Sequence, residues 1–183
     1  MNMPALLPLQ CLKCQSPIAA EVDEVAWVCA TCGQAVLLDE NQAAGLAPLE
    51  IRYHASIRSG QPGRPFWVAQ ATVVVNRQIF SQLFKGNETH QAQEFWQEAR
   101  TFFVPAFACS LDELVSQGMK LLRQPVAMAQ GQPTPFLPVK LSMGDVYPMA
   151  EFIIMGIEAE RKDMVKSVQI QLNLAPPVLW ILP

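Results

Sequence analysis

Histidine, the residue that enzymes use most often as a general acid or base, is nearly absent from this chain. The 183 residues contain two histidines, His54 and His90. His54 is expected on the polar face of a strand and His90 in a polar segment, so we interpret both as solvated residues rather than general bases. A Gly-rich loop between a strand and a helix, which would cradle a phosphate, is also missing. These shortages argue against an enzyme, and an enzyme with an unrecognised site stays open as an alternative.

Long apolar runs and a basic leader are missing as well. The longest apolar runs, such as residues 152–157, have the length of a strand and fall short of the ~20 residues that a membrane-spanning helix requires. Residues 1–10 are apolar but lack the basic start of a signal peptide. Hydrophobic residues make up 51% and charged residues 16%, which is typical of a globular core. We therefore expect a soluble, cytoplasmic protein without a membrane span.

Charge is distributed unevenly along the chain. Residues 1–50 carry one lysine and six acidic residues, whereas residues 51–87 carry five basic residues and no acidic one. The basic residues of segment 51–87, interleaved with Tyr53, Phe66 and Trp67, are Arg52, Arg58, Arg64, Arg77 and Lys85. Proteins that bind single-stranded nucleic acid use such a mixture, so a nucleic-acid-binding module is an alternative function. The scatter of these residues and the overall charge of −3 favour the plainer interpretation that they are ordinary strand residues.

Four of the five cysteines form two Cys-x-x-Cys pairs separated by 14 residues. The pairs are Cys11 with Cys14 and Cys29 with Cys32. A hairpin between them would bring four thiolates to one point, and four sulfur ligands match the tetrahedral coordination of structural zinc. Gly33, directly after the second pair, supplies the positive φ that such a turn often needs, while Gln15 stands at the same place after the first. Iron held by the four sulfurs and a redox role for the pairs are the alternatives to zinc.

This arrangement resembles a zinc ribbon over roughly residues 9–38. The resemblance implies a closed, non-catalytic site for structural Zn²⁺ with the ligands Cys11, Cys14, Cys29 and Cys32. In so small a module, metal binding contributes on the order of 10 kcal/mol or more of folding free energy, so we expect metal removal to unfold it. Trp27 is expected to cover the module as an apolar lid. The fifth cysteine, Cys109, has apolar neighbours and is interpreted as a small core residue.

The whole chain is predicted to be α+β, with a small zinc ribbon followed by a mainly antiparallel sheet and short helices. We place the ribbon at residues 1–40 and the α+β domain at residues 46–183, with a polar linker at 39–45. Alternation over residues 49–58 predicts a half-buried strand that forms a hairpin with 66–75. Residues 102–104 have strand character. Residues 85–93 are polar and fit either a loop or a short helix that begins at Asn87.

Ser110 and Glu113 have the spacing of a capping box, which predicts a helix that ends near Gly118 and a strand at 119–123. Residues 124–138 contain four prolines and are expected to be irregular. Residues 153–177 resemble 102–126 at a shift of 51 residues, which suggests a weak internal repeat with the order strand, helix, strand. The apolar tail, Val178–Leu182, is expected to be buried in its own chain as an edge strand.

These patterns favour a zinc-binding, non-enzymatic protein. The expected task is that of a protein–protein interaction or scaffold component, which uses the acidic ribbon and an apolar surface to join a protein assembly or a homo-oligomer. The alternatives are the nucleic-acid-binding module that uses segment 51–87 and an enzyme with an unrecognised site.

Overall fold

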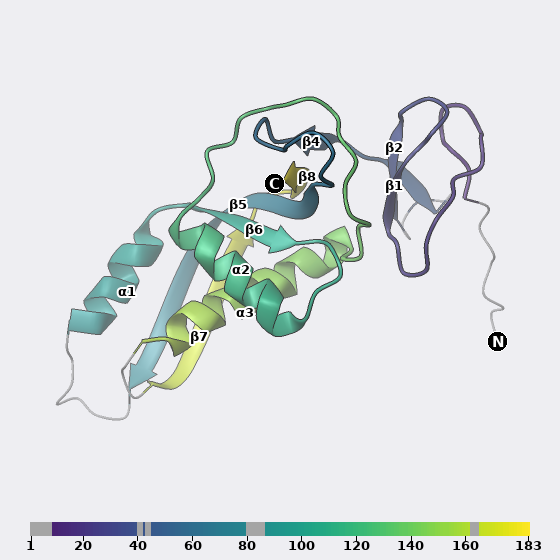
Figure 1. Cartoon of the computed structure of the whole chain (residues 1–183). Coiled ribbons are helices and arrows are strands. Elements are labelled where there is room, and N and C mark those ends of the chain that lie inside the picture. Colours follow the sequence, from purple (N-terminus) through teal and green to yellow (C-terminus); the bar gives the residue numbers. More distant parts are fainter. Residues whose placement is uncertain (1–8, 40–41, 43–44, 80–86, 162–164) are drawn as a thin grey trace, which may run out of the picture.

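Two β-sheets and three α-helices make up the part of the chain that the structure describes. The computed structural model describes residues 9–39, 42, 45–79, 87–161 and 165–183. A small sheet lies at one end of the molecule, and the larger sheet with the helices makes up the rest (Figure 1). The predicted α+β fold with a mainly antiparallel sheet is confirmed. Over the described residues, no helix combines the length and apolar character needed to cross a membrane.

The small sheet has three short antiparallel strands in the order β1-β2-β3. They are β1 (Ala26–Val28), β2 (Ala35–Leu38) and β3 (Leu46–Pro48). Trp27, Val36 and Leu46 form a separate small core on it. The segment 39–45, predicted as a linker, is flanked by β2 and β3, which pair with each other, so the small sheet extends to Pro48.

The large sheet is organised around one long strand, β5 (Arg64–Ile79). Its antiparallel partners are β6 (Arg100–Pro105) along one edge and, along the other, β8 (Val178–Leu182) followed by β7 (Val165–Leu174). A short strand, β4 (Ile51–Tyr53), adds to β8 in parallel. β7 and β8 thus lie end to end along β5, and Pro176 and Pro177, which have no N–H to donate, fall in the break between them.

Two predictions about strand partners are wrong, although the strands exist. The strand predicted at 49–58 is shorter and forms no hairpin with 66–75, because β8 lies between β4 and β5. The tail is buried in its own chain, as predicted, with Leu179 and Ile181 fully buried. It is an inner strand rather than the predicted edge strand, because it pairs on both sides. Local alternation identifies a strand and its buried face but not its neighbours, which lie far away in the sequence.

The helices are α1 (Asn87–Gln97), α2 (Leu111–Arg123) and α3 (Val146–Ala159), and a short 3₁₀ turn, η2 (Met143–Asp145), leads into α3. α2 and α3 contact each other and lie against the large sheet, whereas α1 lies beside the far part of β5 (Figure 1). The polar segment left undecided at 85–93 is thus helical from Asn87 on, and residues 80–86 lie outside the described residues.

α2 begins as predicted but ends later. The hydroxyl oxygen of Ser110 accepts a hydrogen bond from the N–H of Glu113 at 3.2 Å, which confirms the capping box. The helix then passes through Gly118 to Arg123, so the predicted end and the predicted strand at 119–123 are wrong. Glycine is retained in mid-helix because the neighbouring helix comes close: a Cβ at Gly118 would lie 2.3 Å from Cδ1 of Ile153.

α3 stands where the sequence predicted a strand. The buried apolar residues around the run 152–157 have helical spacing, at Ala150, Ile153, Ile154 and Ile157. The suggested repeat matches Phe103, which lies in strand β6, with Ile154, which lies in a helix, so the strand, helix, strand order predicted for 153–177 is wrong. A run that is apolar on every side fits the hydrophobic period of a helix as well as that of a strand. Pro148, in the first turn, was the local sign of a helix.

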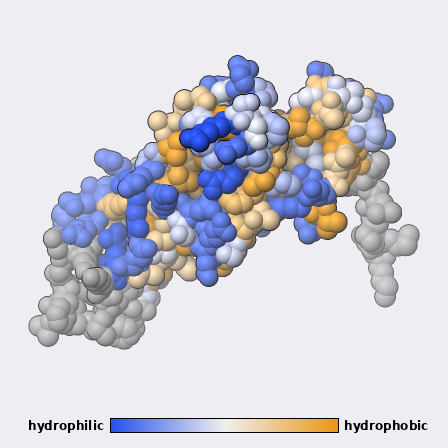
Figure 2. All heavy atoms as spheres, viewed as in Figure 1, coloured by the Kyte–Doolittle hydropathy of each residue, from blue (hydrophilic) through white to orange (hydrophobic). Residues whose placement is uncertain are grey.

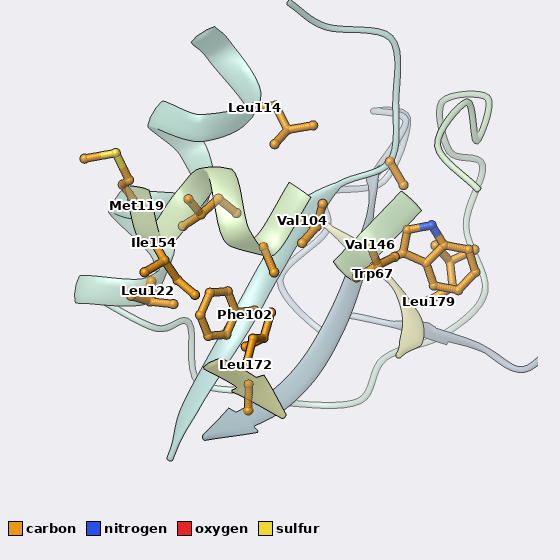
Figure 3. Packing of buried hydrophobic residues seen from close by; sticks show 14 of the residues in the cluster. Trp67, Phe102, Val104, Leu114, Met119, Leu122, Val146, Ile154, Leu172 and Leu179 are labelled. Carbon is orange, nitrogen blue, oxygen red and sulfur yellow. The ribbon is translucent and has the colours of Figure 1, made fainter. Parts of the chain in front are cut away.

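The main core lies between the large sheet and the helices α2 and α3 (Figure 3). It contains Trp67 and Leu179 from the sheet, and Leu122 and Ile154 from the helices. Ala26 and Leu37 of the small sheet belong to the same cluster. The N–H of Val25 also donates to the carbonyl of Val139 at 2.9 Å. The N-terminal module is therefore packed against the rest of the chain rather than tethered to it.

Candidate metal centre

The two Cys-x-x-Cys pairs form two turns of the same construction. In the first, the N–H of Gln15 donates to the carbonyl of Cys11 at 2.9 Å, and in the second the N–H of Gly33 donates to the carbonyl of Cys29 at 2.8 Å. Gln15 has φ 60° and Gly33 has φ 73°. The positive φ expected at Gly33 is confirmed, and Gln15 adopts the same conformation although a side chain makes it less favourable. A non-glycine residue held in this region indicates a turn that its surroundings strongly determine.

The four sulfur atoms converge on one point. Cys11 Sγ lies 3.5 Å from Cys32 Sγ and Cys14 Sγ lies 3.6 Å from Cys29 Sγ. All four sulfurs lie within 4.8 Å of one another, and none of these cysteines is in a disulfide. Four ligands placed tetrahedrally about 2.3 Å from a zinc ion would be separated by about 3.8 Å. The predicted set of four cysteines is therefore brought together, at a spacing that can hold one metal ion.

The pKa values of the cysteine thiols indicate how a cation would act on this cluster. Ser16, through its hydroxyl and backbone N–H, lowers the pKa of Cys14 to about 6. The backbone N–H of Gln34 lowers the pKa of Cys32, but burial and the three neighbouring cysteines outweigh it and raise the pKa to about 12. Four thiolates this close repel one another, whereas a divalent cation among them would stabilise all four.

The surroundings of the sulfurs combine burial with a small apolar core. Cys11 and Cys29 are buried, and Trp27, 5% exposed, packs with Val36 and Leu46 in the small core of the same module. The indole N–H of Trp27 donates to Glu24 Oε2 at 2.9 Å, so its polar end is also satisfied. Since the protein supplies four ligands, a metal held here keeps no coordination position for a substrate.

The histidines do not join this site. His54, predicted to be solvated, is buried: Nε2 lies 2.8 Å from the carbonyl oxygen of Ala127 and Nδ1 lies 2.7 Å from Ser56 Oγ. The prediction fails because the strand ends at Tyr53. The following residue, His54, is bridged to Gln130 of the irregular segment 124–138. His90 is exposed as predicted, with Nδ1 3.4 Å from Glu94 Oε1.

Cys109 is half-buried against the main core, in agreement with the interpretation as a core residue. Burial, together with the charge of Glu113, raises the pKa of its thiol, so little thiolate is present near neutral pH.

The basic residues of segment 51–87 are largely engaged within the chain. Arg52 Nε lies 2.8 Å from Glu50 Oε1, and the guanidinium of Arg64 donates to the carbonyl of Pro183 at 2.8 Å. Arg77 is buried. Arg58 is exposed, and Lys85 lies outside the described residues.

The partner of Arg77 was missed by the sequence reasoning. Arg77 Nε on β5 lies 2.8 Å from Glu158 Oε2 on α3, and both side chains are 2% exposed. Glu158 Oε1 accepts hydrogen bonds from the indole of Trp96 on α1 at 2.9 Å and from Arg161 at 3.0 Å. This cluster ties β5, α1 and α3 together. Glu158 is buried on α3, whereas Glu160, the residue directly after the helix, is exposed.

A surface groove between α2 and α3 was also missed. It has a volume of about 760 Å³ and is lined by both helices. Its exposed apolar side chains are Leu111, Phe152 and Met155, which are 38–48% exposed. Figure 2 shows hydrophobic surface between hydrophilic patches over the part of the molecule that contains these helices. The groove could not be found from sequence because residues 152–157 were assigned to a strand.

Comparisons with protein-family models, with curated proteins and with solved structures find no match for this chain. The functional inferences below therefore rest on the geometry of the chain itself.

Proposed function

We propose that the four cysteines hold structural Zn²⁺ and that the chain is a non-enzymatic, cytoplasmic protein–protein interaction component. Four thiolates in tetrahedral reach favour zinc over metals that prefer oxygen ligands. The closed ligand set supports a structural metal, because catalysis at zinc needs an open position. A site of reduced thiolates is in keeping with a reducing compartment.

The observation that carries the interaction role is the groove between α2 and α3. Phe152 and Met155 are large apolar side chains with 38% and 47% of their surface exposed, on a helix whose other side is locked into the core. A contiguous apolar surface with charged residues at its rim is typical of a protein-binding site. Lys120, Arg123 and Glu160 supply such a rim here. The groove is thus a preformed surface for a protein partner.

Quantitative capture with paired variants tests this role. The tagged full-length chain is immobilised, and retained proteins, including untagged copies of the same chain, are quantified from the native lysate. Met155→Asp is expected to reduce retention at least ~10-fold, because a charge is placed in the centre of the surface. Val74→Asp is the matched control, since Val74 is 52% exposed and lies on β5 outside the groove. Equal retention by the wild type and Met155→Asp would refute the interaction role of the groove.

The nucleic-acid alternative is separated by a salt series. Binding through phosphates weakens steeply as salt rises. Arg77 is committed to Glu158 and Arg64 to the chain end, which leaves few of the predicted cations for phosphate contacts. We expect no salt-sensitive binding of a single-stranded oligonucleotide in a mobility-shift assay, and clear binding that Arg52→Ala and Arg58→Ala weaken would favour the alternative.

A further inference from the structure

The long strand β5 is paired to its end on one edge but only part of the way on the other. On one edge, β7 continues the pairing to Ile79. On the opposite edge, the pairing with β6 stops at Ala71. Beyond that residue, none of the strands that the structure describes pairs with the β6 side of β5. The second half of β5 therefore presents an open strand edge.

The hydrogen-bond pattern shows which backbone groups face this open edge. In an antiparallel pair, every second residue exchanges hydrogen bonds with the partner strand, and the residues between them point their N–H and C=O groups the other way. The carbonyl of Gln70 accepts from the N–H of Ala175 at 2.8 Å, on the β7 side, and the register of β5 with β7 is regular up to Gln78. The backbone groups of Val73 and Val75 consequently point away from β7, into the open edge.

The backbone along this edge is accessible. The side chain of Arg77 is 2% exposed, yet the residue as a whole is half-buried, so its accessible surface belongs mainly to the backbone. Val75 is also half-buried, although its side chain packs against the main core. An accessible strand edge is a template for the pairing of a further strand.

A groove of about 430 Å³ runs along this edge, and we call it the edge groove. One wall consists of the consecutive strand residues 72–76. A groove on a face of the sheet would be lined by alternate residues, so this one follows the edge. The other wall is one side of α1, which lies beside this part of β5 (Figure 1). The helix residues in the wall are Ala92, Gln93, Trp96 and Gln97.

We propose that the edge groove binds an extended peptide segment of a partner protein, which adds to β5 as a further strand in line with β6. The main chain of the segment pairs with the backbone groups of Val73 and Val75. In this mode of recognition, main-chain hydrogen bonds supply affinity and alternate side chains supply specificity. The site is separate from the groove between α2 and α3, because the two share no lining residue. It gives the chain a second surface for a protein partner.

The lining residues define the chemistry of the segment. None of the residues in the two walls is charged, which favours an uncharged segment. Residues directly opposite each other in a sheet share a face. The residue opposite Val74, which is 52% exposed, should therefore be apolar and pack on it. Its neighbours in the segment face the side of Ala92, which is 2% exposed, so small side chains fit there.

The position of α1 favours a separate segment over a second copy of the chain. A single added strand needs only the spacing of about 4.8 Å that separates neighbouring strands. Two copies paired edge to edge through β5 would also have to accommodate both copies of α1, because this helix flanks the edge in each.

The first experiment measures amide hydrogen exchange by NMR in the full-length, zinc-loaded chain. The amide of Val75 should exchange at least ~10-fold faster than those of Val74 and Asn76, which bond to β7. Equal protection of all three amides would show that the edge is already paired, and would overturn the proposal.

The second experiment uses random seven-residue peptides displayed on phage, selected on the same full-length chain. The dissociation constant of a selected peptide is then measured by fluorescence polarisation. Val75→Pro should raise it at least ~10-fold, because proline has no N–H and its ring obstructs the edge. Val75→Ala is the matched control: it also removes the valine side chain but keeps the N–H, so its effect should stay within ~3-fold. Circular dichroism checks that both variants fold.

Methylation of the peptide amides tests the same pairing without changing the protein. Each amide nitrogen of the selected peptide is methylated in turn. Binding should weaken at least ~10-fold at every second position and within ~3-fold at the positions between, because only alternate amides of an added strand face its partner. Losses without this alternation would overturn strand addition even if Val75→Pro did not fold.

The remaining outcomes separate this proposal from the proposed function. Met155→Asp, in the groove between α2 and α3, should leave peptide binding unchanged, whereas Val74→Asp should weaken it by placing a charge beside the segment. Peptides that Met155→Asp releases and Val75→Pro does not would overturn the edge groove and leave the proposed function standing. Failure to select any peptide overturns the edge groove alone. An oligomer of the chain itself that Val75→Pro dissolves would make the second copy the occupant, and the proposal wrong.

Discussion

Removal of the last strand is the most direct test of how the large sheet is built. A chain that ends at Pro177 lacks β8, which pairs with β4 on one side and β5 on the other. Leu179, Trp180, Ile181 and Leu182 are between 0% and 8% exposed. Burial of one such side chain contributes about 1.5–3 kcal/mol, so the four contribute about 6–12 kcal/mol. The net stability of a domain is only about 5–15 kcal/mol, so the shortened chain should not form the large sheet.

The measurement is urea unfolding followed by far-ultraviolet circular dichroism and tryptophan fluorescence. Point variants grade the effect: Ile181→Ala, at a fully buried site, should cost about 2–5 kcal/mol. Val178→Ala, at a half-buried site at the start of the same strand, should cost clearly less. Both variants keep the backbone pairing, so their difference reports the size and burial of the side chains.

Two results would refute the reasoning. A shortened chain with an unchanged cooperative transition would show that β8 contributes nothing to the sheet. A shortened chain that stays folded but loses an oligomeric mass that the full chain shows would indicate that the strand docks on another copy instead of its own chain.

Three further predictions follow from the metal centre, the buried ion pair and the helix contact. Elemental analysis should give one zinc per chain, and Cys29→Ser or a strong chelator should release it and unfold the N-terminal module; a metal-free, reduced module that stays ordered would contradict this. Glu158→Gln should lower the free energy of unfolding by about 3–5 kcal/mol, because it removes the carboxylate charge that faces the buried guanidinium of Arg77, whereas Glu160→Gln on the surface should cost at most about 1 kcal/mol; equal costs in urea would contradict the buried pairing. Gly118→Ala should cost about 1–3 kcal/mol through its clash with α3, despite the better helix propensity of alanine, while Gly144→Ala, whose nearest contact would be an ordinary 3.6 Å, should be near neutral; a stabilised Gly118→Ala would show that the helices are less closely packed.

The metal centre was predictable because its information is local. The spacing of the cysteines and the glycine after the second pair define the turns, and even Gln15 was recognised as the residue in the glycine position of the first. The capping box at Ser110 is equally local. By contrast, β4 and β8 pair with each other although they lie far apart in the sequence, and no short window contains both.

The prediction of a strand in the α3 region failed for a different reason. Its residues are apolar on nearly every side, so neither the period of a helix nor that of a strand stands out. Once the helix was missed, the burial of Glu158 and the groove beside Met155 were missed with it, because both depend on which side of a helix a residue occupies.

The place of β8 in the middle of the large sheet also has a consequence for synthesis on the ribosome. The paired strands and the two cysteine turns of the N-terminal module lie within residues 9–48, so their local contacts can form while the rest of the chain is still being made. The large sheet cannot close in that way, because β4 must wait for β8, the last strand of this sheet in chain order. Until β8 has left the ribosome, β5 offers an open apolar edge where β8 will later pair. The nascent chain should therefore depend on chaperones most strongly between the synthesis of β5 and that of β8.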